Sequence, residues 1–557
     1  MTPKNSCDSK TKDADCCENL SIKQSQNASL PYKNTGYFSS LICDYLNQND
    51  SLKPFYQNFS NLNGYKQQIA LKQNCISASS QTRQVLVSAL KLQYKKVQAS
   101  EPSLKNIQSL LSENTFTVTT GHQLNLFTGP LYFLYKIVTV INLAKELKCA
   151  FPDKNFVPIY WMATEDHDFE EINYFNFKGQ KVKWNGSAGG AVGQLSTKGL
   201  NEVFNEFSKN IGSNKSAEYL KELFEKAYLK HENLADATFY LANELFSSYG
   251  LVIIDADNSD LKRLFVPIIK DELVNQTCFK AVNKSAKELA ELHYKIQVNP
   301  RDINLFYLLK NKRERIVFEQ NTYKILNTDL VFTEAQILEA VDLHPERFSP
   351  NVLMRPLYQE RILPNLSYTG GGGELAYWFE MKAYFDSVGV PFPILLLRNS
   401  VLVMNQKQLL KLNKLNLKVE QLFLKQTDLI NLAVKALSDI NLDLSVQKVT
   451  IQNLFTELKT LALQTDKSFI GAVNAQEHKQ INGFEKLEAR LLKAQKRKYN
   501  ELTKRIFNLQ NDLFPNQSLQ ERTQNFSELY LELGTELIPL LIKHLNPLAL
   551  EFTILVV

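Results

Sequence analysis

The sequence predicts a doubly wound α/β fold followed by a helical C-terminal region. Five short apolar runs that read as buried strands alternate with helical patterns between residues 116 and 397, and the pattern after Val403 is helical throughout. Loops with glycine or charged residues follow the ends of these runs. Because such loops gather along one edge of a parallel sheet, we expect a ligand at that edge.

The composition is that of a soluble globular protein. Hydrophobic residues make up 44% of the chain and charged residues 22%. A length of 557 residues is too great for one ordinary hydrophobic core, so we expect two or three domains. A net charge of +6 permits anionic small-molecule substrates without requiring nucleic acid. The seven cysteines are scattered and form no zinc-binding pattern, which favours a reducing cytoplasm. Residues 1–30 read as a flexible tail, and no stretch predicts a signal peptide or a membrane span.

The first strand is predicted at residues 116–120, after helical patterns over residues 37–108. Gly121 to Gly129 supply turn residues, and Pro130 suits the first turn of the helix that follows. The unpaired N–H groups and the positive dipole end of such a helix favour a phosphate or carboxylate. This stretch therefore predicts an anion-binding loop.

A second apolar strand, predicted at residues 155–164, runs directly into Glu165-Asp-His-Asp168. Such a run is often a solvated acidic turn in which Asp168 caps a helix. The exit of a buried parallel strand, however, lies beside the exit of its neighbour, where ligands bind. This position favours a functional role for His167 or Asp168.

Two inserted segments interrupt the strands. The first, about residues 176–245, begins with a glycine-rich predicted hairpin and continues as helices to a strand at residues 249–255. That strand ends in Asp255-Ala-Asp257, a carboxylate pair that either caps the next helix or holds Mg²⁺ or a ribose hydroxyl; the cap is favoured. The second insert, about residues 280–345, carries strand-like runs with basic residues and predicts a small β-rich piece.

Four consecutive glycines, Gly370 to Gly373, follow a strand-like run and precede a helix that starts near Glu374. A backbone without side chains approaches an anion closely and presents several N–H groups to it, although glycines also form plain hinges. No Gly-Lys-Ser/Thr follows, so this is not a P-loop. The last buried strand, residues 390–397, ends at Arg398-Asn-Ser400.

Residues 401–557 are predicted to form a helical domain with a coiled coil. Apolar residues from Phe484 to Leu513 recur at steps of three and four, with one break around Gln495. This pattern predicts either an antiparallel hairpin with residues 401–437 or a dimer. Basic residues between Lys493 and Arg505 are able to contact RNA, but without interleaved aromatic residues a solvated helix face is the more common reason for them.

Six motifs along the chain form a distinctive set. They are Thr120-Gly-His-Gln-Leu-Asn-Leu-Phe-Thr-Gly-Pro-Leu-Tyr132, Trp161-Met-Ala-Thr-Glu-Asp-His-Asp168, Phe348-Ser-Pro-Asn351 with Arg355-Pro-Leu-Tyr-Gln-Glu360, Gly370-Gly-Gly-Gly-Glu-Leu-Ala-Tyr-Trp378, Leu395-Leu-Leu-Arg-Asn-Ser400 and Pro515-Asn-Gln-Ser-Leu-Gln-Glu-Arg522. Together they resemble the BshC family, the cysteine ligases that complete bacillithiol biosynthesis, and the likeness runs from about Pro31 to the C-terminus. His122 departs from the family, where we expect glutamine, and adds a group able to titrate near neutral pH.

The resemblance implies a Rossmann-like core related to class I aminoacyl-tRNA synthetases, with inserted connective segments, and a C-terminal coiled coil used for homodimerisation. It also implies a ligase that joins cysteine to glucosaminyl-malate through an amide bond. Thr128-Gly-Pro-Leu-Tyr-Phe-Leu-Tyr135 is similar to the class I signature loop, with tyrosines where its histidines stand. Arg398-Asn-Ser400 lies in place of the lysine-rich loop but has no lysine, so these motifs supply few cations for phosphate chemistry.

Amide formation from a free carboxylate requires activation, which we expect from ATP and Mg²⁺, and a base that deprotonates the sugar amine. The catalytic candidates are His167, Asp168 and Asp166, with His167 or Asp168 as base and orienter. Nucleotide or anion binding is assigned to Gly121, Thr128, Gly129, Gly370, Gly371, Gly372, Gly373, Asn399 and Ser400. Substrate binding is assigned to His122, Gln123, Tyr132, Tyr135, Arg355, Tyr358, Glu374 and Arg398. No protein metal site is predicted, although a mixed site of His122, His167 and a carboxylate stays open.

Two other classes of function stay open. One is an RNA-binding relative of the synthetases that uses the basic coiled coil, for which RNA affinity would depend steeply on salt. The other is a dimeric scaffold with a degenerate nucleotide pocket, which the missing class I histidines favour.

Overall fold

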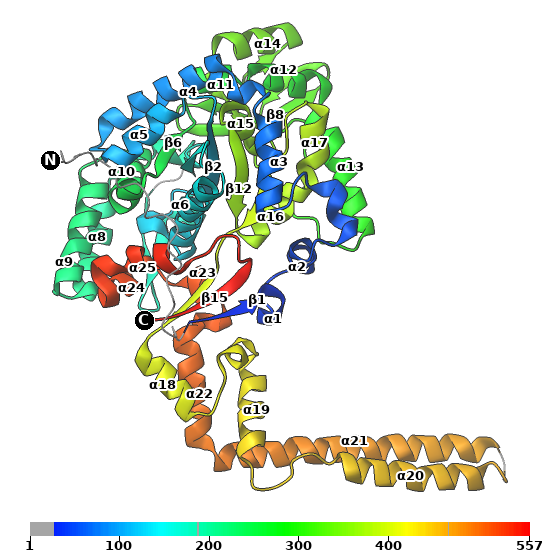
Figure 1. The fold of residues 1–557 in the computed structure, drawn as a ribbon. Helices are drawn as coiled ribbons and strands as arrows, with labels where there is room; N and C mark the ends of the chain where they lie inside the picture. The colour runs from blue at the N-terminus through cyan, green and yellow to red at the C-terminus, as the bar shows by residue number, and fades with distance from the viewer. Residues whose placement is uncertain (1–26, 187–188, 466) are drawn as a thin grey trace, which may run out of the picture. The chain divides into compact units, whose positions relative to one another are not determined.

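The computed structural model describes residues 27–186, 189–465 and 467–557, which form two compact units (Figure 1). Unit 1 holds the described residues up to Lys33, Tyr37–Val401 and Glu521–Thr553, and unit 2 holds Asn34–Gly36, Leu402–Gln520 and Ile554–Val557. Most of the predicted flexible tail, residues 1–26, lies outside the described residues. Ala28–Pro31 forms strand β1, so the last residues of the predicted tail, 28–30, are part of a strand.

A five-stranded parallel sheet lies in unit 1 and confirms the five predicted strands (Figure 1). In spatial order the strands are β13 (Ile394–Leu397), β12 (Asn365–Gly370), β2 (Thr115–His122), β3 (Asn155–Met162) and β6 (Val252–Asp255). All four pairings are parallel. Along the chain, β2 is followed by β3 and β6 on one side of it, and then by β12 and β13 on its other side. The direction in which strands are added to the sheet therefore reverses between β2 and β12. A doubly wound sheet binds its ligand at such a reversal.

Strand β2 is buried over its whole length, and the hydroxyl groups of Thr117, Thr119 and Thr120 are paired inside the sheet. Thr117 and Thr119 both donate to Oδ1 of Asn365 on β12, at 3.2 and 2.8 Å. Thr120 donates to the carbonyl oxygen of Thr369 at 2.8 Å. An unpaired buried hydroxyl costs about 1–3 kcal/mol. These contacts therefore fix β12 against β2 and hold the exits of the two strands side by side.

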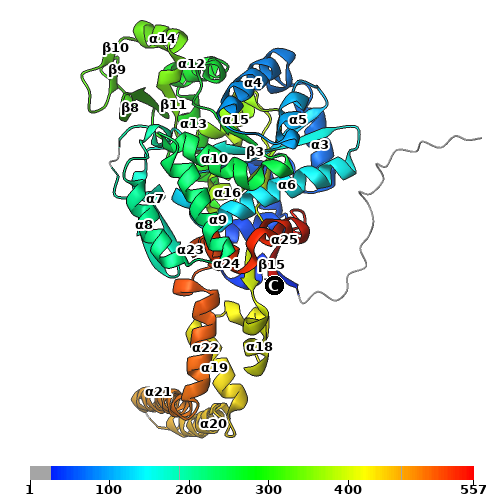
Figure 2. The same ribbon diagram turned by 90° about the vertical axis from the view of Figure 1, so that its left-hand side faces the viewer.

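Helices from three parts of the chain pack on or beside this sheet. Helix α6 (Tyr132–Ala150) contacts β2 and β3. The predicted N-terminal helices are α3 (Leu62–Lys72), which contacts β12, α4 (Ser80–Gln93), which contacts β6, and α5 (Glu101–Ser109), which contacts β3. The C-terminal helices α24 (Phe526–Leu533) and α25 (Leu537–His544) belong to unit 1 and pack on α9 (Lys215–Phe224) and α6 (Figure 2).

A fully buried ion pair joins α3 to α15 (Arg355–Ile362). Lys72 Nζ lies 2.6 Å from Glu360 Oε2, and both side chains are 0% exposed. The other carboxylate oxygen, Oε1, accepts from Gln359 Nε2 at 3.0 Å and from Asn365 Nδ2 at 2.5 Å. The carboxylate is therefore satisfied on both oxygens, as a buried charge must be.

The first insert begins with the predicted hairpin. Its strands β4 (Tyr174–Phe177) and β5 (Gln180–Lys183) are antiparallel, and helices α8 (Leu200–Ile211), α9 and α10 (Leu234–Phe246) follow.

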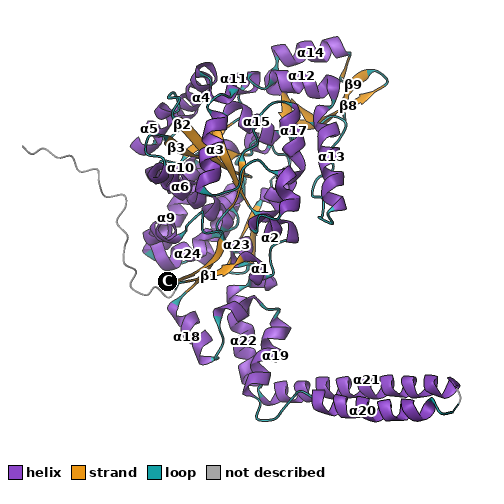
Figure 3. Cartoon of the chain, turned by 45° about the vertical axis from the view of Figure 1, so that its right-hand side comes forward, coloured by secondary structure: helices purple, strands orange, loops and turns teal. Residues whose placement is uncertain are grey.

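The second insert confirms the β-rich piece. After helix α13 (Thr277–Glu291), its antiparallel sheet has the order β10-β9-β8-β7-β11, with β7 (Leu305–Leu309), β8 (Lys312–Glu319), β9 (Thr322–Ile325), β10 (Val331–Phe332) and β11 (Phe348–Pro350). Helix α14 (Glu334–Leu343) contacts β9, β10 and α12 (Val266–Asn275) (Figure 3).

Unit 2 is built from helices α18 (Gln406–Lys414), α19 (Gln426–Leu437), α20 (Ser445–Ala462), α21 (Lys467–Lys498) and α22 (Asn500–Leu513). Helices α20 and α21 lie side by side around Phe455, Ala462 and Val473 (Figures 1 and 3). The ion pairs Lys448–Glu488 and Lys459–Glu477 link them.

The predicted hairpin is correct in kind but its pairing is shifted. The partner of the long helix α21 is mainly α20 rather than residues 401–437, while α19 contacts both α21 and α22. The expectation of helix throughout after Val403 is wrong at the end of the chain, where Glu551–Val556 forms strand β15. The β-branched and aromatic run Phe552-Thr-Ile-Leu-Val556 is the signal for this strand.

Candidate active site

A cavity of about 750 Å³ lies in unit 1 where the strand order reverses. Gly121 and His122 line it from the end of β2, and Gly371 to Gly373 line it from the loop after β12. Further lining comes from the loop after β3, from α6 and from the inserted antiparallel sheet. The cavity therefore occupies the position where a doubly wound sheet binds its ligand.

The lining carries more positive than negative charge, with seven cationic side chains against four carboxylates. The cations are Lys136, Arg301, Arg313, Arg315, Arg355, Arg398 and Arg522, and the carboxylates are Glu165, Asp166, Glu171 and Glu374. Such a surplus in a concave, partly desolvated site attracts anions. Tertiary structure thus supplies the cations that the class I-like motifs lack.

Buried Lys136 and partly exposed Glu374 form an ion pair between α6 and α16 (Gly372–Trp378). Lys136 Nζ lies 2.7 Å from Glu374 Oε2 and donates to the carbonyl oxygen of Gly121 at 2.8 Å. Glu374 also accepts from the Gly371 N–H at 2.8 Å and from the Tyr368 hydroxyl at 3.1 Å. Burial raises the pKa of Glu374, but Lys136 and these donors outweigh burial and hold the pKa below its usual range. Glu374 is therefore an ionised anchor that ties the glycine run to β2.

His122 is buried, and its ring lies between Tyr132 and Phe133, with centroids 5.5 and 5.1 Å away. Its Nε2 has no hydrogen-bond partner among the described residues. Burial lowers the pKa of His122 well below its ordinary value, and the charge of Lys136 lowers it further. His122 is therefore neutral at pH 7, which corrects the expectation that it titrates near neutrality.

Two arginines of the lining, the partly exposed Arg355 and the buried Arg398, each keep one buried nitrogen without a partner among the described residues. Arg355 donates from Nη1 to Gln359 Oε1 at 3.1 Å, and its Nη2 has no partner within the described part of the chain. Arg398 donates from Nη2 to Glu521 at 2.7 Å and from Nη1 to Ser400 at 3.1 Å, and its Nε has no described partner. A buried unpaired donor is costly, so both arginines are prepared for a hydrogen-bond acceptor in the cavity.

The loop after β3 brings Asp166 and His167 to the cavity and leaves Asp168 outside it. Asp166 Oδ2 accepts from Gln123 Nε2 at 2.8 Å, and Oδ1 accepts the His167 backbone N–H at 2.7 Å. Asp168 is exposed and stands before helix α7 (Phe169–Ile172) without a side-chain capping bond. The structure therefore brings together two of the three predicted catalytic residues.

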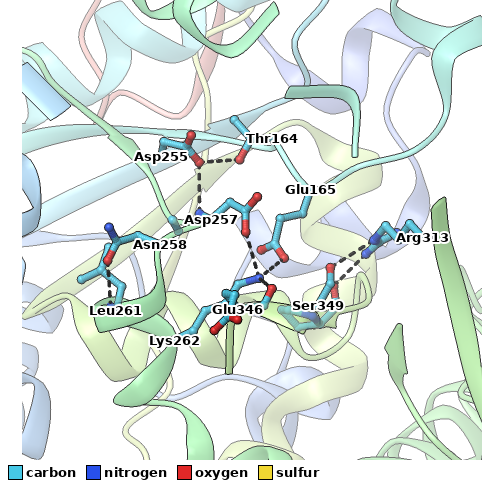
Figure 4. Close-up of polar contacts among 12 residues, drawn as sticks. Thr164, Glu165, Asp255, Asp257, Asn258, Leu261, Lys262, Arg313, Glu346 and Ser349 are labelled. Carbon is cyan, nitrogen blue, oxygen red and sulfur yellow. Dashed lines mark hydrogen bonds and ion pairs between the residues drawn. The ribbon is translucent and has the colours of Figure 1, made fainter. Parts of the chain in front are cut away.

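A cluster of carboxylates beside this loop is organised by Lys262 (Figure 4). The Lys262 ammonium lies 2.6 Å from Glu165 Oε1 and 3.0 Å from Asp257 Oδ1, and it donates to the carbonyl oxygen of Glu346 at 3.0 Å. Burial raises the pKa of Asp255 to about 7, although a hydrogen bond from Thr164 opposes this. The cluster holds the exits of β3 and β6 together.

The predicted cap at Asp255 or Asp257 is wrong. Asn258 caps helix α11 (Ser259–Arg263) by accepting from the backbone N–H groups of Asp260 and Leu261. Asp257 instead pairs with Lys262, which a local sequence pattern does not reveal.

Thr128 and Gly129 do not line the cavity, because their loop turns into the protein. Phe127, Thr128 and Gly129 all have positive φ, at 48°, 69° and 64°. Asn525 donates from Nδ2 to the carbonyl oxygens of Phe127 and Gly129, at 2.7 and 2.6 Å. The Leu131 N–H donates to the carbonyl oxygen of Gln524 at 2.8 Å. Residues 524–525 thus cover the second part of the predicted anion-binding loop, whereas Gly121 at its start lines the cavity.

Five other predicted site residues also lie outside the cavity lining: Tyr135, Tyr358, Gly370, Asn399 and Ser400. The Tyr358 hydroxyl donates to the carbonyl oxygen of Ala256, and Asn399 Nδ2 donates to that of Asn546. The carbonyl oxygen of Gly370 accepts the Arg398 N–H. These groups serve internal packing.

Sequence reasoning missed several lining residues, above all Lys136, Arg313 and Arg522. A lone lysine on the apolar face of a predicted buried helix was the available signal for Lys136. Arg313 stood among the basic residues of the second insert, where no local pattern separates one arginine from its neighbours.

The described residues contain no group of three or more His, Cys, Asp or Glu side chains placed to hold a metal ion. Among the described helices, none combines the length and apolar character that crossing a membrane requires.

Comparisons with known proteins agree along the chain. The family model "Bacillithiol biosynthesis BshC, N-terminal Rossmann-like domain" matches residues 26–399, and "Bacillithiol biosynthesis BshC, C-terminal coiled-coil domain" matches residues 401–557. A protein of Flavobacterium johnsoniae is 55% identical over 95% of this chain and 99% of its own length. Proteins of Flavobacterium psychrophilum and Christiangramia forsetii are 55% and 53% identical over 94% of this chain and 98% of their own lengths. Each is named "Putative cysteine ligase BshC".

Proposed function

The chain belongs to the BshC family of bacillithiol biosynthesis, and we propose that it joins the carboxyl group of cysteine to the amine of glucosaminyl-malate. The Rossmann-like core and the coiled-coil domain are those of the family, and the chain is a ligase. The two substrates, the activation chemistry and the site residues are the proposed part.

The unpaired donors of Arg355 and Arg398 carry this proposal. Both guanidinium groups line a cavity with a surplus of positive charge, and each keeps one buried N–H without a partner in the described residues. Guanidinium groups recognise carboxylates with strong, charge-assisted hydrogen bonds. Malate contributes two carboxylates to glucosaminyl-malate, so this substrate supplies the acceptors that the two arginines lack.

The chemistry requires an activated cysteine carboxyl and an unprotonated amine. The amine nitrogen attacks the acyl carbon, the amide C–N bond forms, and the bond from the acyl carbon to the oxygen of the activating phosphate breaks. The proton lost by the amine passes to a base in the cavity. Asp166 is our first candidate for that base, because its carboxylate lines the cavity and is held by Gln123.

We propose ATP as the source of the activating phosphate. The cavity fits an anionic nucleotide because three further arginines of its lining, Arg301, Arg315 and Arg522, would hold its phosphates. Mg²⁺ usually binds through one or two protein carboxylates together with phosphate oxygens. Glu171, which lines the cavity and accepts from Gln123 Nε2, would serve as such a carboxylate.

We also propose a cytoplasmic homodimer. The apolar side chains of Leu454, Leu458 and Leu461, which share one face of α20, are exposed and leave an apolar stripe for a second copy of the coiled coil. Cys43, Cys75 and Cys278 form no disulfide, as expected in a reducing compartment.

The test is direct. The purified chain is incubated with cysteine, glucosaminyl-malate and ATP, and the amide product is measured by mass while AMP and ADP are measured in the same sample. Product that depends on all three reactants supports the proposal, and the nucleotide product distinguishes an acyl-adenylate (AMP) from an acyl-phosphate (ADP). Absence of product from a folded preparation, with all three reactants verified, contradicts it.

A further inference from the structure

His167 is contacted by an arginine, and this contact determines where the imidazole carries its proton. Arg313 on β8 approaches with Nη1 2.9 Å from His167 Nδ1. A guanidinium group has only donors and keeps its charge in proteins. Nδ1 must therefore accept this hydrogen bond, and the single proton of the neutral ring lies on Nε2.

The inserted sheet fixes the guanidinium of Arg313 from several directions. Its Nε donates to Ser349 Oγ and its Nη2 to the carbonyl oxygen of Pro350, both at 3.0 Å, and the contact with Ser349 is visible in Figure 4. The guanidinium carbon lies 3.9 Å from the centre of the Phe306 ring. Phe306 stands opposite Ser349 in the pairing of β7 with β11, so one pair of strands supplies both contacts. Arg313 is thereby held in one orientation.

In the described part of the chain, no carboxylate lies within hydrogen-bond distance of this ring nitrogen. Asp166 Oδ1 lies 3.7 Å from His167 Nδ1, beyond hydrogen-bond distance, and it already accepts the His167 backbone N–H. In a Ser-His-Asp triad the carboxylate accepts from Nδ1–H and leaves the other nitrogen free to take a proton. Arg313 produces the opposite tautomer.

From this geometry we propose that Arg313 is a positioning residue that fixes His167 as the Nε2–H tautomer, so that His167 donates a hydrogen bond to the reacting acyl group rather than acting as a general base. The donor role rests on the proposed ligase reaction, whereas the tautomer does not. Nε2–H would donate to the carbonyl oxygen of the activated cysteine, which gains negative charge when the amine attacks. The base is then a different group, which agrees with Asp166 as first candidate.

The tautomer is tested without any substrate. The chain is labelled with [¹⁵N]histidine, and long-range ¹H–¹⁵N correlation spectra identify the protonation of each ring nitrogen. Of the seven histidines, His167 is assigned by the signal that disappears in His167→Gln. We expect an unprotonated Nδ1 and a protonated Nε2 at pH 7.5. In Arg313→Met the signals should shift to a tautomer mixture, whereas Arg315→Met, which changes a neighbouring arginine of the same strand, should leave them unchanged.

Two results of this experiment overturn the tautomer assignment. One is an Nδ1–H or doubly protonated His167 in the unsubstituted chain at pH 7.5. The other is an unchanged tautomer in Arg313→Met.

The donor role is tested by comparing His167→Gln with His167→Ala in the ligation assay. A glutamine places an amide N–H near the position of imidazole Nε2 but cannot take up a proton. We expect His167→Gln to keep kcat within about tenfold of the unsubstituted chain and His167→Ala to lower it by about 100-fold or more, the usual cost of losing one such donor. Equal loss in both variants indicates a base and overturns the donor role. If the unsubstituted chain forms no product, the proposed reaction has failed, and the spectra still decide the tautomer.

Discussion

Replacing Lys72 by methionine should destabilise unit 1 strongly, because it leaves the Glu360 carboxylate without its cation. Both side chains are 0% exposed, so water cannot replace the lost partner. Removing one member of such a pair costs about 3–5 kcal/mol. The two amide donors to Oε1 remain, which places our expectation at the lower end, about 3 kcal/mol.

Urea unfolding followed by tryptophan fluorescence measures this effect in the right part of the molecule. The three tryptophans, Trp161, Trp184 and Trp378, all belong to unit 1. With a slope of about 3 kcal/mol per molar urea, a loss of 3 kcal/mol lowers the midpoint by about 1 M. The slope is larger for larger units, so 1 M is an upper value.

The double variant Lys72→Met, Glu360→Gln is the control. It removes both charges and keeps an oxygen to accept from Gln359 and Asn365, so at least half of the lost stability should return. A midpoint for Lys72→Met within 0.2 M (about 0.6 kcal/mol) of the unsubstituted chain, or a double variant less stable than the single one, would refute the reasoning.

Three further predictions follow from particular contacts. Asp255 has a folded-state pKa raised from 3.8 to about 7, so the stability that it contributes is complete below about pH 4 and is lost as the pH rises through 7. In Asp255→Asn, Oδ1 still accepts from Thr164, so the free energy of unfolding in urea should equal that of the unsubstituted chain at pH 4.5 and exceed it by about 1–2 kcal/mol at pH 8. This difference is smaller than full burial would give, because the side chain keeps some exposure. A difference that does not change with pH contradicts the prediction. Gly129→Ala should cost more than 2 kcal/mol in thermal unfolding, since φ is 64° and the new Cβ would meet Asn125 Cβ at 2.6 Å, whereas Gly179→Ala, with φ of 75° and open space, should cost only about 1 kcal/mol. Light scattering after gel filtration should show a dimer. The double variant Leu454→Glu, Leu461→Glu should dissociate this dimer, whereas the control variant Asn453→Glu, Thr460→Glu should not. A monomer in the unsubstituted chain would end the dimer proposal.

The sequence was sufficient to predict the parallel sheet, because a strand buried on both faces must be a continuous apolar or β-branched run. Thr115–His122 and Ile394–Leu397 are such runs, and each is recognisable without its neighbours. The sequence also predicted that the polar loops after the strands gather along one edge of this sheet, and the cavity lies at that edge. Twelve of the predicted site residues line that cavity for this reason.

What the sequence could not predict depends on contacts between distant segments. Asn525 covers the loop at Phe127 and Gly129 from about 400 residues away, and no local pattern at Thr128 or Gly129 records this. The contact of Arg313 with His167 likewise depends on how the inserted sheet meets the end of β3. Local patterns place a side chain on an element, but its partner is decided by tertiary packing.

Unit 1 is discontinuous in the chain, and this affects how the protein can mature during synthesis. Glu521 and Arg522 follow the helices of unit 2, yet Glu521 neutralises Arg398 and Arg522 lines the cavity. At about 5–20 residues per second, a ribosome needs roughly 6–24 seconds to make residues 402–520. During that interval the residues of the five parallel strands have been synthesised, but Glu521, the carboxylate partner of Arg398, has not. The nascent ligase therefore cannot complete its cavity until the coiled coil has been made.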